Sequence, residues 1–197
     1  MPTSTPDVLR LYRELTPLRM VHRFQQHSTI RPESIAEHSY FVALLAGSFA
    51  ASLHAAGVSV NRAQCIEAAL WHDAPEVVTG DIPAGTKWAA PELDRCLDVL
   101  ETAVMRRLAA DAGCPGFPDH GPIPALDSIE WAVVKLADMV ELVCYVEEER
   151  AAGNHTLDPA RTSVIELIFA YQLFQPFGHG AERWFKDFLG GWRRDED

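Results

Sequence analysis

The chain has 197 residues, of which 48% are hydrophobic and 23% charged, with 28 Asp and Glu against 17 Lys and Arg. This length suits one folded domain, and the composition excludes an intrinsically disordered chain. The formal net charge of −11 argues against a nucleic-acid polymer as partner, because that affinity comes from Lys and Arg neutralising phosphates. Small anionic ligands are not excluded, because a metal ion or a single arginine can set the local sign.

Helical periodicity dominates the chain, and strand patterns are nearly absent. Helices are expected over Asp7–Leu15, Ser34–Leu53, Asn61–Val78, Leu93–Ala112, Ala125–Ala152, Pro159–Phe174 and Ala181–Leu189. Irregular segments are expected at His22–Glu33, Asp81–Pro91 and Gly113–Pro124, with a charged, frayed tail at Arg193–Asp197. The sequence therefore predicts an all-α domain of six or seven helices.

The helix that begins near residue 34 has clear signals at both ends. Ser34-Ile35-Ala36-Glu37 is a capping box, in which the serine and the glutamate each accept a hydrogen bond from the other's backbone N–H. Gly57 follows the apolar run as a stop signal, and Asn61 is expected to cap the next helix.

Four cysteines, Cys65, Cys96, Cys114 and Cys144, form no C-x-x-C pair. Reduced, buried thiols are therefore expected rather than a zinc knuckle. The N-terminal segment lacks the apolar core of a signal peptide, and no run approaches the roughly 18 apolar residues that a membrane span needs. These features predict a cytoplasmic protein with no membrane partner.

The string W-H-D-A-P-E-V-V-T-G-D at Trp71–Asp81 is the most informative segment. On the expected helix, His72 and Asp73 lie about 100° apart, so both side chains can face one cation. Imidazole nitrogen and carboxylate oxygen together suit Zn, Mn, Fe or Co better than Ca. Glu76 lies one turn after His72, where a carboxylate can act as general base on metal-bound water without being a ligand.

Two further metal ligands are expected on other helices, His38 and Asp138. Asp138 lies in a segment that is apolar nearly all the way round, where an unpaired carboxylate costs several kcal/mol and so needs a partner. Taken alone, Asp138 also fits a buried ion pair, for example with Arg23, and His38 fits a half-buried polar residue at a helix start. The combination on three apolar helices is a stronger signal than any of its parts.

The order His38, His72-Asp73, Asp138 resembles the HD-domain superfamily of metal-dependent phosphohydrolases. Further motifs resemble its bacterial 5′-deoxynucleotidase branch: Arg23, Ala36–Ser39, His72–Pro83, Lys87, Lys135–Asp138 and Glu148–Asn154. The resemblance implies a single HD domain over residues 1–197. Its motif-bearing part would be 23–154, followed by C-terminal helices at 155–192 and the charged tail at 193–197.

The resemblance also implies one divalent metal ion, which can be Co, Mn, Zn, Fe or Ni. Its ligands would be His38, His72, Asp73 and Asp138. Arg23 falls where the branch binds the substrate phosphate, and its planar guanidinium suits bidentate contact with phosphate oxygens. Phe24 stands where the branch typically carries a tryptophan beside the deoxyribose, which leaves sugar and base discrimination open.

By the same resemblance, Glu76 and Asp81 correspond to two catalytic acids. A divalent ion lowers the pKa of bound water from about 15.7 towards 7, and Glu76 would orient or deprotonate that water. Arg23 would stabilise charge on the phosphoryl oxygens. Lys87 would assist it, or would be a lysine on a solvated loop. Asp81 would bind the sugar 3′-hydroxyl, help to protonate the leaving oxygen, or merely cap a turn.

The activity implied by the resemblance is phosphate release from 2′-deoxynucleoside 5′-monophosphates. One alternative is a deoxynucleoside triphosphate triphosphohydrolase, as in some small phage HD proteins. Two others are an HD-fold binding protein that keeps the metal without turnover, and a helical interaction protein without metal. A homo-oligomer, dimeric or larger, is also implied.

Overall fold

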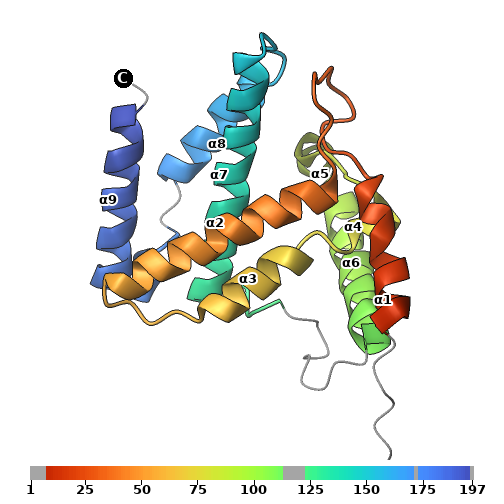
Figure 1. Ribbon diagram of the computed structural model, residues 1–197, viewed down its shortest axis with the longest axis horizontal. Helices are drawn as coiled ribbons and strands as arrows, with labels where there is room; N and C mark the ends of the chain where they lie inside the picture. Colours follow the sequence, from red (N-terminus) through yellow and green to blue (C-terminus); the bar gives the residue numbers. More distant parts are fainter. Residues whose placement is uncertain (1–7, 113–122, 171–172, 196–197) are drawn as a thin grey trace, which may run out of the picture. The chain divides into compact units, whose positions relative to one another are not determined.

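A computed structural model of the chain describes residues 8–112, 123–170 and 173–195, and these residues form helices with no β-strand (Figure 1). The α-helices are α1 (Val8–Leu15), α2 (Ile35–Ala55), α3 (Arg62–Trp71), α4 (Glu76–Thr79), α5 (Ala84–Ala89), α6 (Pro91–Ala112), α7 (Ile129–Ala151), α8 (Asp158–Ala170) and α9 (His179–Asp195). Two short 3₁₀ helices are η1 (Thr16–Arg19) and η2 (Gln175–Phe177). The predicted all-α fold class is confirmed.

The chain divides into two compact units. Unit 1 comprises Met1–Ser39 and Leu70–Ile123, and unit 2 comprises Tyr40–Ala69 and Pro124–Asp197. Helices α2 and α3 each begin in one unit and end in the other. In the described part of the chain, no helix is both long enough and apolar enough to cross a membrane.

The core of unit 1 forms where α6 packs beside α1, as Figure 1 shows. Its buried side chains come from α6, from the last residue of α3 and from the turn that follows it: Trp71, Ala74, Val104, Met105 and Leu108. Partly buried side chains of α1 and α4 pack against this cluster. The core therefore anchors the segment that carries the His-Asp pair.

Unit 2 is held by a close approach of two helices and by an aromatic cluster. A Cβ at Gly47 of α2 would lie 3.0 Å from the Ile66 side chain of α3, so glycine permits this contact. On α9, Trp184 stacks on Phe188 with ring centroids 5.8 Å apart and contacts Phe49 of α2. These contacts bury the apolar faces of amphipathic helices.

The predicted helix over Asn61–Val78 is wrong, because α3 ends at Trp71 and the His-Asp pair lies in a turn before α4. Pro75 has no N–H to donate to the Trp71 carbonyl. That oxygen instead accepts from the backbone N of Ala74 at 2.9 Å, a tighter turn than an α-helix makes. The helical spacing assumed for His72 and Glu76 therefore does not apply.

Several other predicted boundaries shift. The loop expected over Asp81–Pro91 contains α5, which starts directly after Pro83. Ser128 caps α7, which begins later than expected, because the serine hydroxyl accepts from the Trp131 backbone N. Helix α9 continues to Asp195, so the predicted frayed tail is wrong over residues 193–195. Residues 113–122 of the predicted connection lie outside the described residues.

The cysteine prediction is partly wrong. Cys65 is buried, as expected, but Cys96 and Cys144 are exposed. These three thiols are free, and Cys114 lies outside the described residues.

The predicted capping box at the start of α2 is confirmed. The Glu37 carboxylate accepts hydrogen bonds from the Ser34 backbone N at 2.9 Å and from the Ser34 hydroxyl at 2.7 Å. The Ser34 Oγ in turn accepts from the Glu37 backbone N at 3.2 Å. This cap fixes the first turn of α2, which carries His38.

Replacing Ser34 with alanine should destabilise the protein by about 1 kcal/mol, the usual cost of losing an N-cap side chain. Urea unfolding followed by circular dichroism measures this change. The matched control is Ser48→Ala in the same helix, because the exposed Ser48 hydroxyl only donates to the Leu44 carbonyl one turn earlier. Equal losses in the two variants would contradict a role for the capping box.

Candidate metal and phosphohydrolase site

The His-Asp turn sits between two anchors in the core of unit 1. Trp71 and Ala74 are buried against α6, on either side of His72 and Asp73 in the sequence. A turn pinned at both ends has little freedom to move, so the two polar side chains are held by packing rather than by a helix.

The structure brings His38, His72 and Asp73 together within unit 1. The Nε2 atoms of His38 and His72 lie 3.4 Å and 3.1 Å from the same Asp73 Oδ2, and the two imidazole centroids are 5.3 Å apart. Both imidazoles are buried, whereas the Asp73 side chain is 25% exposed. Burial raises the pKa of Asp73, but the nearby charge of His72 and hydrogen bonds from both histidines outweigh it and hold the pKa well below its usual range.

Arg23 is held beside this group by two contacts. Its Nη1 lies 2.9 Å from the Glu33 carboxylate and 2.8 Å from the Nδ1 of His38. Because a guanidinium only donates, the His38 Nδ1 accepts and turns its Nε2 edge towards Asp73. Glu33 is buried, and the sequence reasoning missed it, because nothing in the local sequence shows its pairing with a residue ten positions away.

Glu76, the first residue of α4, carries a strongly perturbed carboxyl group. Burial and the negative charges of Asp73 and Asp81 raise its pKa to about 9, while the charges of Arg23 and Lys87 oppose this rise. Its Oε2 is buried and accepts no hydrogen bond from the described residues. A carboxyl group in this environment takes up a proton readily, as a general base does.

Asp81 follows Gly80, whose φ of +69° belongs to the left-handed region that glycine adopts without strain. The Asp81 carboxylate accepts a hydrogen bond from the backbone N–H of Phe24, and burial raises its pKa. Phe24 itself has a φ of +57°, which is uncommon for an aromatic residue. The Arg23 guanidinium lies 5.0 Å from the Phe24 ring centroid, a cation–π contact.

Lys87 lies on α5 rather than on a solvated loop. Its Nζ is 3.5 Å from the Glu101 carboxylate on α6. The Lys87 side chain is 30% exposed and that of Glu101 is 29% exposed. Glu101 is the second residue that the sequence reasoning missed.

Asp138 belongs to unit 2, where it lies on α7. Its carboxylate accepts from Lys135 Nζ at 3.0 Å, one turn earlier on the same helix. This contact does not decide between an ion pair and a metal ligand, so the predicted role of Asp138 stays a prediction.

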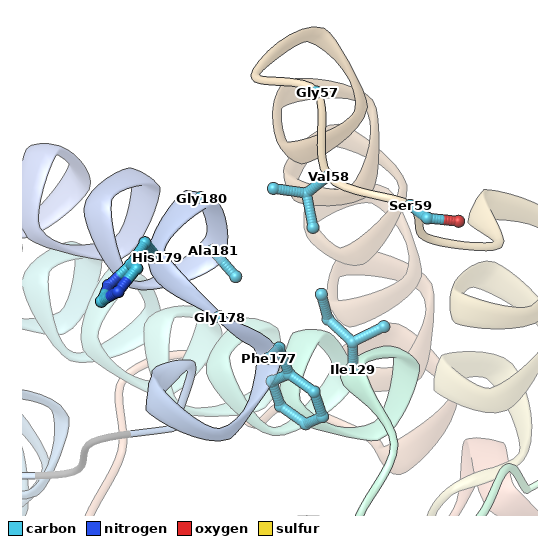
Figure 2. Close-up of a pocket in the computed structure, with 9 residues that line it drawn as sticks. All are labelled: Gly57, Val58, Ser59, Ile129, Phe177, Gly178, His179, Gly180 and Ala181. Atoms are coloured by element: carbon cyan, nitrogen blue, oxygen red, sulfur yellow. The ribbon is translucent and has the colours of Figure 1, made fainter.

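Unit 2 also has a shallow pocket of about 370 Å³ at the start of α9 (Figure 2). It is lined by Gly57, Val58, Ser59, Ile129, Phe177, Gly178, His179, Gly180 and Ala181. None of these residues carries a carboxylate, and the fully exposed His179 ring points away from Val58 and Ile129. The pocket therefore lacks the donor set for metal-dependent chemistry.

The residues gathered in unit 1 fit a divalent transition metal. Two imidazole nitrogens and a carboxylate oxygen converge, and this donor set suits Zn, Mn, Fe or Co. A cation here would also offset the repulsion between Asp73 and Glu76 that raises the Glu76 pKa.

The helical fold is that of the HD-domain phosphohydrolases. An HD-domain phosphohydrolase from Listeria innocua matches with a TM-score of 0.71 and 23% identity, over 91% of this chain and 86% of that chain. An HD phosphohydrolase of cyanophage S-2L was solved with dA and one catalytic Zn²⁺ ion. It matches with a TM-score of 0.65 and 21% identity, over 93% of this chain and 96% of that chain. At these identities, the likenesses show the fold.

The chain belongs to the 5′-deoxynucleotidase YfbR-like family, whose sequence model matches residues 10–176. A 5′-deoxynucleotidase of Vibrio cholerae is 30% identical over 154 residues, or 76% of this chain and 79% of that protein. The 5′-deoxynucleotidase YfbR of Escherichia coli is 29% identical over 187 residues, which are 85% of this chain and 91% of that protein.

The raised pKa of Glu76 predicts a pH-dependent stability for the metal-free protein. Between its ordinary pKa of 4.5 and about 9, the folded state keeps a proton that the unfolded state has released. Rising pH therefore favours unfolding across this window, with a contribution of up to about 1.4 kcal/mol per pH unit.

In Glu76→Gln this contribution should disappear, because the amide mimics the protonated acid at every pH. Denaturant unfolding of chelator-treated protein between pH 5 and 9 measures the slope. Glu92→Gln, an exposed residue of α6, is the control that should keep it. Identical slopes in wild type and Glu76→Gln would contradict the raised pKa.

Proposed function

We propose that this chain is a metal-dependent 5′-deoxynucleotidase that releases phosphate from 2′-deoxynucleoside 5′-monophosphates. Family membership over residues 10–176 supports the activity. The single observation that carries it to particular residues is the convergence of His38 and His72 on Asp73, with the proton-accepting Glu76 in the same unit.

In this proposal, one divalent ion is held by His38, His72, Asp73 and Asp138. When bound, it supplies Lewis-acid polarisation of a phosphoryl oxygen and makes water more acidic. The donor types of these four residues allow Co, Mn, Zn, Fe or Ni.

Arg23 and Glu76 have complementary tasks. Arg23 donates to the phosphate through its guanidinium, which Glu33 orients in advance. Glu76 takes a proton from the attacking water. In the metal-free protein its raised pKa keeps Glu76 protonated at neutral pH. A bound cation would offset the repulsion from Asp73 that contributes to this rise, so that the carboxylate is free to accept a proton.

Asp81, Phe24 and Lys87 complete the substrate contacts. Asp81 binds the 3′-hydroxyl of the sugar or supplies the proton that the leaving oxygen needs. The Phe24 ring packs near the deoxyribose in place of the tryptophan typical of the family. Lys87 adds a second positive charge near the phosphate.

Two other expectations remain predictions. Homo-oligomerisation is one, and it is tested by sedimentation velocity. A cytoplasmic location is the other, and it is tested by fractionating cells that produce the protein.

The direct test of the function is incubation with dAMP, AMP and dATP in the presence of Co²⁺ or Mn²⁺, followed by identification of the released anion. The proposal expects inorganic phosphate from dAMP and little from AMP. Release of triphosphate from dATP alone would instead assign a triphosphohydrolase. A metal-loaded protein that hydrolyses no nucleotide in a broad panel would be a binding protein.

Two substitutions separate the metal ligand from the proton acceptor. Asp73→Ala should abolish metal binding and activity together, because it removes a ligand. Glu76→Ala should keep the metal and lower kcat by about 10²-fold or more, the usual contribution of a general base. Metal content by mass spectrometry and phosphate release measure the two effects. A Glu76→Ala variant with full activity would refute its assigned role.

A further inference from the structure

Glu101 lies on the face of α6 that otherwise carries apolar side chains. The helix faces the core of unit 1 through Leu97, Val104, Met105 and Leu108, all of which are buried. Glu101 follows Leu97 by four residues and precedes Met105 by four, so it lies in the same row. A carboxylate in such a row costs free energy unless a partner compensates for it.

The partner is Lys87, whose Nζ lies 3.5 Å from the Glu101 carboxylate. Lys87 belongs to α5, a helix of only six residues that has little stability of its own. Glu101 lies midway along α6, which has 22 residues and is anchored in the core. Glu101, on the anchored helix α6, can therefore hold Lys87, which lies on the short helix α5.

This pair is coupled electrostatically to the candidate site. The charge of Lys87 opposes the rise in the Glu76 pKa, and the charge of Asp73 contributes to a raised pKa of Glu101, after the larger effect of burial. Both members of the pair are thus within electrostatic range of the residues that we assign to metal binding and proton transfer.

We propose that Glu101 is a positioning residue that holds the Lys87 ammonium group on the side of the site that receives the nucleotide phosphate. The inference rests on the proposed function, in which Lys87 contacts the substrate. A lysine side chain loses considerable rotamer freedom when it is fixed. An ion pair that fixes it before the substrate arrives reduces this loss on binding.

The test is Glu101→Met, which removes the charge and fits the core-facing row of α6. The KM for dAMP should rise about tenfold, the size of one charge-assisted hydrogen bond, while kcat changes by less than twofold. The melting temperature should stay the same or rise, because methionine replaces a partly buried charge. A purely structural role would instead lower the melting temperature and the active fraction at unchanged KM.

Two further variants make the result specific. Glu101→Gln keeps an oxygen that accepts from the ammonium group, so its KM should lie between those of wild type and Glu101→Met. Glu92→Met changes an exposed glutamate of the same helix, paired only with Arg95 one turn away in the described structure, and should leave KM unchanged.

A double-mutant cycle with Lys87→Met decides whether Glu101 acts through Lys87. Lys87→Met alone should raise KM, and adding Glu101→Met should raise it no further. Independent, multiplicative effects would overturn the inference, as would an unchanged KM in both Glu101 variants of an active enzyme. If the wild-type protein leaves all deoxynucleotides intact, the proposed function fails and this inference fails with it.

Discussion

Three carboxylates, Asp73, Glu76 and Asp81, share one partly buried region of unit 1, and they cannot all ionise there without compensating cations. This constraint explains why cationic side chains surround them. Arg23 and Lys87 each lower the pKa of Glu76, but neither removes its rise to about 9. A divalent ion would neutralise the negative charge that Arg23 and Lys87 leave uncompensated, so the site needs a positive charge that the polypeptide itself does not supply.

Each of the two cations is held by a carboxylate outside the predicted set. Glu33 contacts Arg23, and Glu101 contacts Lys87. The two anchors differ in kind, because Glu33 is fully buried whereas Glu101 is about a third exposed. A more buried pair is less screened by salt and solvent, so the orientation of Arg23 is the more firmly determined of the two.

The sequence predicts the helices well wherever capping and periodicity agree, as at the capping box of α2. It fails at the His-Asp pair, because the apolar pattern continues through Pro75 while the backbone does not. The residue types that suit a metal ion were visible in the motif. Glu33 and Glu101 were not, because their partners lie at least ten positions away. Only one signal was available for Glu101, its acidic character within the apolar row of α6.

The backbone and the ring of Phe24 make separate contacts. Its amide, turned by a φ of +57°, donates to Asp81, while its ring lies near the Arg23 guanidinium. The hydrogen bond to Asp81 uses no atom of the ring, so exchange between tryptophan and phenylalanine leaves that bond available. The size of the aromatic group at position 24 can therefore change without loss of the hydrogen bond that holds Asp81.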